Sequence, residues 1–160
     1  MSELDLTPYR RHGTLAGRCL CGACRIGISG RHLGAVGACH CSMCRMWSGT
    51  VYATFDAEAD AVSVTGPVGR YQSTPWSERA FCTTCGSHLW LRNTNEADAE
   101  YELMPGLFEG AADFPLISEI YIDRRPAWMP ISGNHRTKTR AEYERDNPSI
   151  EGPAREGNDP

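Results

Sequence analysis

Apolar and polar residues alternate in short runs along the chain, and this pattern predicts a β-rich fold. Six runs either alternate strictly or are rich in β-branched and aromatic residues: 25–29, 50–55, 61–65, 87–92, 101–104 and 117–122. Gly, Pro or Asn follows most of them, as expected where a strand gives way to a turn. We therefore expect a mostly-β fold with an antiparallel sheet or sandwich.

Helical signals are weak by comparison. The segment Thr139–Arg145 has the composition of one or two helical turns, with Thr137 or Thr139 as the N-cap. A length of 160 residues favours a single domain, which we place at 14–146. We expect flexible termini over 1–13, which is polar, and over 147–160, which is rich in Pro, Gly and charge.

Charge and terminal composition exclude several classes of function. The formal net charge is −4 and no block of Lys and Arg is present, so we do not expect a nucleic-acid partner. No run is long and apolar enough to span a membrane, and the first residues lack the apolar core of a signal peptide. We expect a soluble cytoplasmic protein, with a homo-oligomer left open.

Eight cysteines dominate the candidate chemistry, and in the cytoplasm such a set indicates metal binding more than disulfides. They form three groups: Cys19, Cys21 and Cys24; Cys39, Cys41 and Cys44; and Cys82 and Cys85. A C-x-x-C turn brings two thiolates to one ion, and Gly86 supplies the permissive backbone that such a turn uses. The sequence therefore predicts two Zn²⁺ ions.

The spacing leaves two ways of dividing the cysteines. A zinc ribbon would pair Cys21 and Cys24 with Cys82 and Cys85, and would leave the other four cysteines for a second closed site. The alternative pairs Cys19 and Cys21 with Cys82 and Cys85. A site of three thiolates then remains, and Cys24 is spare.

Three motifs resemble those of the glutathione-dependent formaldehyde-activating enzyme family, also called the centromere protein V/Gfa family. They are Gly17-Arg18-Cys19-Leu20-Cys21-Gly22-Ala23, Cys39-His40-Cys41-Ser42-Met43-Cys44-Arg45 and Arg79-Ala80-Phe81-Cys82-Thr83-Thr84-Cys85-Gly86-Ser87. The resemblance implies an Mss4-like β-tent built from small antiparallel sheets around zinc. It also implies a carbon–sulfur lyase that joins formaldehyde to glutathione.

The resemblance further implies the second division of the cysteines. Cys19, Cys21, Cys82 and Cys85 would hold a structural zinc, and Cys39, Cys41 and Cys44 would hold the functional zinc. Three protein ligands and one exchangeable position are typical of catalytic zinc, and a substrate thiol bound there would lose its proton. We expect the site to act on an adduct of glutathione, or a similar small thiol, with formaldehyde or another small electrophile.

Residues beside the cysteines are weaker candidates. Arg45 is a candidate for holding a glutathione carboxylate, and Trp47 for flanking the substrate, although core packing suits Trp47 better. His40 on a strand would point away from the metal. Arg79 and His88 favour structural roles. No separate acid or base is assigned.

Two other functions remain as alternatives. One is a non-catalytic zinc module that binds a thiol or a protein partner. The other is a redox protein, for which Cys24 is the obvious reactive thiol, although it has no clear resolving partner.

Overall fold

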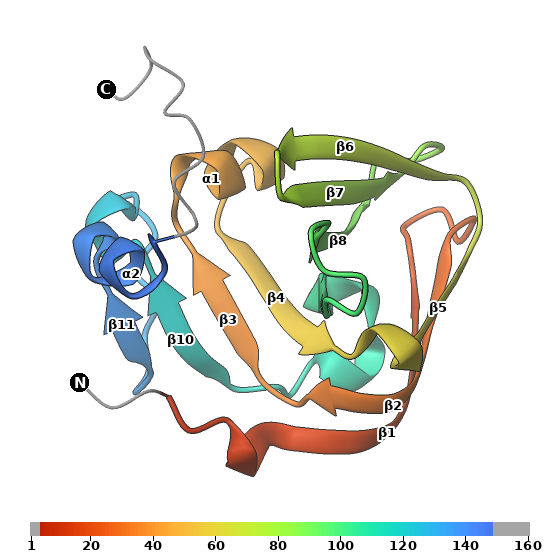
Figure 1. Cartoon of the computed structure of the whole chain (residues 1–160), viewed down its shortest axis with the longest axis horizontal. Helices are drawn as coiled ribbons and strands as arrows, with labels where there is room; N and C mark the ends of the chain where they lie inside the picture. The colour runs from red at the N-terminus through yellow and green to blue at the C-terminus, as the bar shows by residue number, and fades with distance from the viewer. Residues whose placement is uncertain (1–3, 149–160) are drawn as a thin grey trace.

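The computed structural model describes residues 4–148 and shows a mostly-β molecule (Figure 1). The strands are β1 (Arg10–Arg18), β2 (Arg25–Leu33), β3 (Val36–Cys39), β4 (Tyr52–Ala57), β5 (Val62–Thr65), β6 (Val68–Thr74), β7 (Ser77–Cys82), β8 (His88–Asn93), β9 (Tyr101–Leu103), β10 (Leu116–Ile120) and β11 (Arg136–Lys138). The α-helices are α1 (Ser42–Ser48) and α2 (Arg140–Asp146). Single 3₁₀ turns lie at η1 (Thr7–Tyr9), η2 (Ala59–Ala61), η3 (Pro105–Leu107), η4 (Glu109–Ala111) and η5 (Ile122–Arg124).

The strands form one strongly curved sheet in the order β11-β10-β3-β4-β9-β8-β7-β6. The hairpin β1–β2, with β5 beside β2, joins this sheet through β4. Most pairs are antiparallel, but β10 runs parallel to both β3 and β11. Figure 1 shows β6 and β7 beside α1 at one end of the molecule and β1–β2 at the other. The expected mostly-β fold class is confirmed.

Each of the six expected strands is present, because alternation and β-branched composition report a half-buried sheet well. The largest core cluster forms on one sheet face around Phe55, Trp90 and Leu103. A smaller cluster of Cys44, Tyr52 and Leu91 lies on the opposite face. The last expected run stops at Ile120, since Tyr121 adopts a left-handed backbone with φ of 58°.

The expected flexible segment 1–13 is wrong for its last four residues. Arg10 to Gly13 belong to β1 and pair with Leu33 to Gly30 of β2, so the ladder fixes their backbone despite their polar side chains. The first strand therefore begins four residues before the expected domain start at residue 14. The rest of the expected tail, 149–160, lies outside the described residues, as do 1–3.

Both α-helices depend on their caps. Thr139 is the N-cap of α2 and forms a capping box with Glu142, which confirms the expected turn there. The helix α1 was not expected: Cys41 is its N-cap, and Gly49 ends it with a φ of 73°. None of the described helices has the length and apolar composition needed to cross a membrane.

Candidate metal centres

Four cysteines from two distant turns converge beside the β1–β2 hairpin. Cys19 and Cys21 lie in the turn that follows β1, while Cys82 ends β7 and Cys85 lies in the turn before β8. Their four sulfur atoms all lie within 4.8 Å of one another. The sulfurs of Cys19 and Cys21 are 3.5 Å apart, and those of Cys21 and Cys82 are 3.9 Å apart.

These separations fit zinc. Four thiolates placed tetrahedrally at a Zn–S distance of about 2.3 Å are about 3.8 Å apart. Gly86, with a φ of 76°, donates its N–H to the carbonyl of Cys82 and closes the turn as expected. The side chain and backbone of Ser87 hydrogen-bond to Cys85 and lower the pKa of its thiol to about 5, so this sulfur readily becomes the thiolate that zinc requires.

Cys24 stands outside this group. Its side chain is fully buried, and its thiol donates a hydrogen bond of 3.4 Å to the carbonyl of Pro67. Its backbone N–H donates to the sulfur of Cys19 at 3.2 Å, so Cys24 supports a candidate ligand. Burial raises the pKa of the Cys24 thiol to about 12, which makes it a poor nucleophile. The structure therefore groups the cysteines as in the second division, and not as in the zinc ribbon, which needs Cys24 as a ligand.

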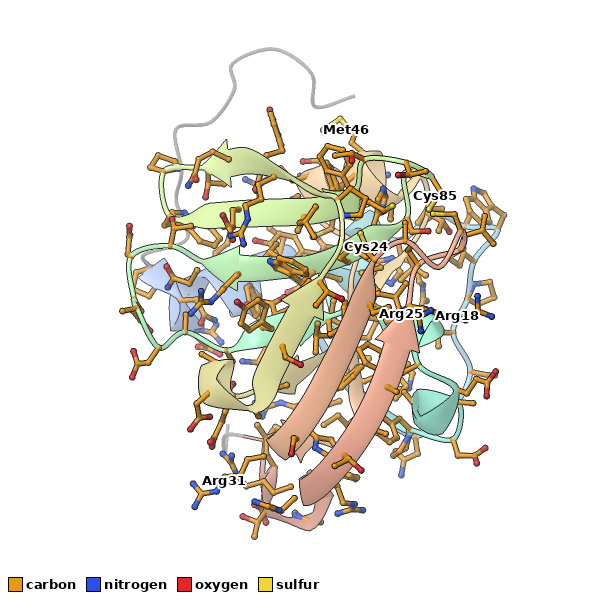
Figure 2. The ribbon with its side chains drawn as sticks, turned by 90° about the vertical axis from the view of Figure 1, so that its right-hand side faces the viewer. Arg18, Cys24, Arg25, Arg31, Met46 and Cys85 are labelled. Atoms are coloured by element: carbon orange, nitrogen blue, oxygen red, sulfur yellow. The ribbon has the colours of Figure 1, made fainter. Side chains whose placement is uncertain are left out.

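Figure 2 places Cys24 and Cys85 at the same end of the β1–β2 hairpin, with Arg31 at the opposite end. The four-cysteine centre therefore joins the first hairpin to the turn between β7 and β8. The sequence distance between these two parts is large, since Cys21 and Cys82 are 61 residues apart.

A second group contains three cysteines from one short segment. Cys39 ends β3, Cys41 is the N-cap of α1 and Cys44 lies in the first turn of this helix. Their sulfurs also lie within 4.8 Å of one another, and among the described residues no fourth His, Cys, Asp or Glu completes the set. The backbone N–H of Cys44 donates to the sulfur of Cys41 at 3.4 Å.

Hydrogen bonds among the three thiols favour the thiolate form of Cys41. Donation from the thiols of Cys39 and Cys44 lowers the pKa of Cys41 to about 3, and the nearby Arg79 charge adds to the effect. The group thus holds a thiolate near neutral pH. Thiolate donors of this kind suit zinc, so both groups have the donor chemistry of a zinc centre.

Arg79 brings a buried positive charge to the three-cysteine group. It is 3% exposed, and its Nη2 lies 3.6 Å from the sulfur of Cys44. Its guanidinium lies over the rings of Tyr52 and Trp47, at 5.3 and 5.8 Å from their centroids. Such stacking fixes the orientation of the guanidinium plane.

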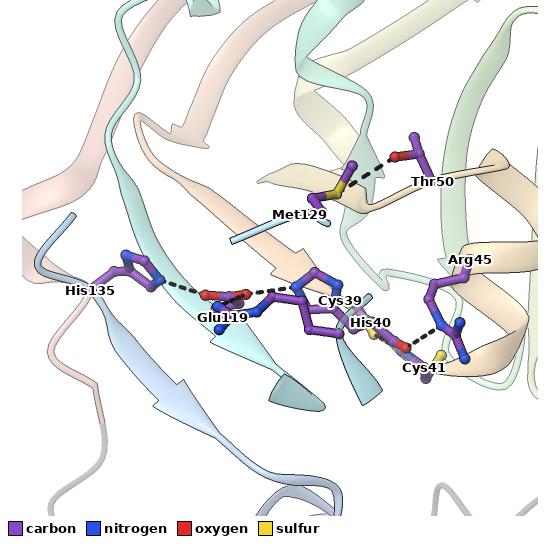
Figure 3. Close-up of polar contacts among 9 residues, drawn as sticks. Cys39, His40, Cys41, Arg45, Thr50, Glu119, Met129 and His135 are labelled. Atoms are coloured by element: carbon purple, nitrogen blue, oxygen red, sulfur yellow. Dashed lines mark hydrogen bonds and ion pairs between the residues drawn. The ribbon is translucent and has the colours of Figure 1, made fainter. Parts of the chain in front are cut away.

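A buried carboxylate supports the segment from the other side (Figure 3). Glu119 on β10 is fully buried and accepts hydrogen bonds from His40 at 2.7 Å, His135 at 2.7 Å and Arg125 at 3.1 Å. Burial alone would raise the pKa of Glu119, but these three donors outweigh it and hold the pKa below its usual value. His40 therefore points away from the cysteines, as expected, and ties their segment to β10.

Two further acids face the same side of the sheet as Arg79. Asp56 on β4 is directly opposite Glu102 on β9, Glu102 is opposite Leu91, and Leu91 is opposite Arg79. Residues directly opposite each other share a face. Burial, with a contribution from Asp56, raises the pKa of Glu102 to about 8.

An open depression of about 390 Å³ lies on the surface beside the turn of the four-cysteine centre. Six residues line it: Gly86, Ser87, His88, Met104, Gly106 and Leu107. Gly86 and Ser87 belong to the turn of the four-cysteine centre. Met104 packs against the cluster that contains Cys44, and His88 stacks on Trp47 at 4.7 Å between ring centroids.

Comparison with known proteins decides the family. A model of the glutathione-dependent formaldehyde-activating enzyme family matches residues 14–124, which is more than half of the chain. The chain belongs to this family.

Similar proteins agree with this assignment. An uncharacterized lyase of Schizosaccharomyces pombe is 32% identical over 117 residues, which cover 69% of this chain and 80% of the relative. A protein of Halomonas elongata, assigned provisionally as a glutathione-dependent formaldehyde-activating enzyme, is 28% identical over 138 residues, or 81% and 88% of the two chains. A crystal structure of a Rhodobacter sphaeroides protein matches with a TM-score of 0.50 and 24% identity, over 63% of this chain and 98% of that one, and supports the fold.

This chain brings seven of its cysteines into the two groups that the resemblance implied.

The two residues expected to contact the substrate already have partners within the protein. Arg45 donates its Nε–H to the carbonyl of His40 at 2.9 Å. Trp47 packs among Tyr71, Phe81 and His88. Their roles in substrate binding stay predictions.

Sequence reasoning missed Tyr52, Glu102 and Glu119, and it assigned Arg79 a structural role. A sequence signal existed for two of them: Glu102 and Glu119 are charged residues inside runs expected to be strands. Their partners come from distant strands, so their environment was not visible in the sequence.

Proposed function

We propose that the protein is a zinc-dependent carbon–sulfur lyase that makes and breaks the adduct of glutathione, or a similar small thiol, with formaldehyde or another small electrophile. The observation that carries the proposal is the inequality of the two cysteine groups, four against three. Family membership and the names of the similar proteins support the reaction class.

The four-cysteine group, Cys19, Cys21, Cys82 and Cys85, is complete for a structural zinc. The group of Cys39, Cys41 and Cys44 would hold the functional zinc. Zinc held there would offer one exchangeable position at which a substrate thiol is kept as a thiolate. Because three cysteine thiolates already surround the site, we expect it to carry a thiolate nucleophile rather than to activate water.

The surrounding residues have separate tasks in this proposal. Arg79 offsets the negative charge that accumulates on the thiolates, and Glu119 fixes the segment that carries Cys39 and Cys41 through His40. The depression beside His88 and Met104 is the place we assign to the peptide part of the thiol, since Met104 on its wall also packs against the cluster that contains Cys44.

Exchange of ¹³C-formaldehyde with glutathione, followed by NMR, tests the proposal. We expect the wild-type protein to accelerate the exchange above the spontaneous rate, and Cys41→Ser to return it to that rate. Cys24→Ser is the matched control, because it removes a sulfur that lies outside both groups.

Equal acceleration by wild type and Cys41→Ser would place the activity elsewhere on the protein. No acceleration by the wild type, together with no binding of glutathione, would overturn the proposed function.

A further inference from the structure

Three hydrogen-bond donors with no acceptor surround the three-cysteine group. They are Nη1 of Arg79, the hydroxyl of Tyr52 and Nε1 of Trp47, each of which is buried and lacks a partner among the described residues. Buried polar atoms are paired in the great majority of cases, so an unpartnered donor calls for an explanation. The guanidinium of Arg79 lies over the rings of both Tyr52 and Trp47, so the three side chains form one cluster, and this cluster indicates a place that receives an acceptor.

Arg79 is the centre of this cluster. Its guanidinium lies between the rings of Tyr52 and Trp47, and its other nitrogen, Nη2, reaches the sulfur of Cys44. No ion pair with a carboxylate forms on Arg79 in the described part of the chain, although a buried cation without one is costly. Arg70, which lies over Trp90, differs from Arg79 because it is paired with Glu78 at 2.6 Å, although Nε1 of Trp90 also lacks a partner among the described residues.

The position of the cluster specifies what the acceptor is attached to. A guanidinium 3.6 Å from the sulfur of Cys44 lies beside the place where a substrate sulfur would join the group. An aldehyde-derived oxygen is separated from that sulfur by a single carbon atom. An oxygen on this carbon is therefore close to the guanidinium of Arg79, which already reaches the sulfur of Cys44.

We infer that Arg79 and Tyr52 form an oxygen-binding subsite for the aldehyde part of the adduct, with Trp47 completing its wall. The inference rests on the proposed function. Arg79 would act as a catalytic residue by stabilising negative charge on that oxygen, and Tyr52 by donating a hydrogen bond to it.

The reaction that this subsite assists is balanced without any further reagent. In the direction of breakdown, the hydroxyl proton passes to solvent and a lone pair of the oxygen forms the C=O bond. The electron pair of the C–S bond moves to sulfur, which leaves as a thiolate. The reverse direction places the negative charge on the oxygen, where the permanent charge of an arginine stabilises it.

Two ligands that differ in one oxygen test the subsite. S-hydroxymethylglutathione and S-methylglutathione share every group except the hydroxyl on the carbon bonded to sulfur. We expect Arg79→Met and Tyr52→Phe to weaken binding of the hydroxymethyl ligand, by roughly 10- to 100-fold for the arginine, because a hydrogen bond from a charged donor is lost. Binding of the methyl ligand, measured by NMR titration, should change less than about twofold.

Arg70→Met is the matched control, since it removes an arginine that stacks on a tryptophan outside the site. Zinc content of each variant shows whether it is folded and loaded, and Tyr52→Phe, which loses one oxygen atom, keeps the test valid where Arg79→Met fails to fold. In exchange experiments Arg79→Met should lower kcat by about 100-fold or more, as removal of an oxyanion donor does.

The outcomes separate the claims. Equal weakening of both ligands by Arg79→Met would mean that the guanidinium holds a glutathione carboxylate, and would overturn the subsite. Unchanged binding of both would overturn it as well. A wild-type protein that binds neither ligand and does not accelerate exchange would overturn the proposed function itself.

Discussion

Glu102 keeps its proton at neutral pH, and its position in the sheet explains why. Asp56 lies directly opposite it, and both side chains face away from the larger core. Two adjacent carboxylates that are partly removed from water repel each other, so one of them keeps its proton. Burial accordingly raises the pKa of Glu102 from 4.5 to about 8, and burial with Glu100 nearby raises that of Asp56 to about 6.

This shift predicts a dependence of stability on pH. Between about pH 4.5 and 8 the folded protein binds a proton on Glu102 that the unfolded chain does not, so the free energy of unfolding falls as pH rises. We expect Glu102→Gln to remove this slope, about 1 kcal/mol per pH unit, or about 2–4 °C in Tm. Thermal melts from pH 6 to 8.5 measure it, with a substitution of the exposed Glu96, Glu96→Gln, as the control.

A steeper slope in Glu102→Gln than in the wild type would contradict this sign. An unchanged slope would mean that Glu102 ionises normally.

Cys24 shows what the sequence left open at the scale of one residue. The cysteine spacing allowed two divisions, since Cys21 is near enough in sequence to pair with either neighbour. The turn after β1 favours the second division, because it directs the sulfur of Cys24 toward the carbonyl of Pro67 and its N–H toward Cys19. The path of a single backbone turn thus separates Cys24 from the four grouped sulfurs, and no composition rule reports that path.

Cys24→Ser should therefore keep two zinc ions per chain, while Cys41→Ser should keep one. The serine hydroxyl still donates to the Pro67 carbonyl, so we expect a small loss of stability, about 1 kcal/mol. Elemental analysis of the purified variants gives the zinc content. Loss of a whole zinc from Cys24→Ser would restore the ribbon arrangement.

At the scale of elements, α1 depends on groups that lie far away in the sequence. Its first turn carries Cys44 and its N-cap is Cys41, but the residue before the cap, His40, is held by Glu119 of β10. The sequence predicted six of the eleven described strands, because alternation is a local signal, and it missed β1, β3, β6, β7 and β11. It did not predict α1 because seven residues between two caps have little periodicity of their own.

Glu119→Gln should loosen this segment more than the fold as a whole. The substitution keeps the shape of the side chain but removes the charge that His40, His135 and the half-buried Arg125 share. Losing one partner of a buried pair costs about 3–5 kcal/mol. We expect the variant to fold and to hold one zinc tightly and the second weakly. Competition with a chromogenic chelator measures both affinities.

Retention of two equally tight zinc ions in Glu119→Gln would show that the carboxylate does not position the three-cysteine segment. Equal weakening of both ions would show a general loss of structure instead. Arg70→Gln, which breaks the more exposed pair with Glu78, controls for the loss of an ion pair as such.

At the scale of the whole molecule, the two cysteine groups have different structural consequences. The four-cysteine group joins the β1–β2 turn to the β7–β8 turn, which are far apart in the sheet order. The three-cysteine group lies within residues 39–44, where Glu119 bonds to His40 and Arg79 reaches the sulfur of Cys44. In the proposed function, a zinc ion at the first group would therefore be part of the fold, whereas a zinc ion at the second would not.

Removal of metal should accordingly occur in two phases. A chelator should first take the zinc of the three-cysteine group while the far-ultraviolet circular dichroism stays unchanged, and the second zinc should leave only as the sheet unfolds. Glutathione at ten times its Kd should slow the first phase about tenfold and leave the second unaffected, because a ligand protects by the ratio of its concentration to its Kd. Release of both ions in a single step with loss of the sheet signal would mean that the two groups are equivalent. Protection of the second phase by glutathione would mean that the thiol binds at the four-cysteine group. Either result would remove the asymmetry on which an open, substrate-binding position depends.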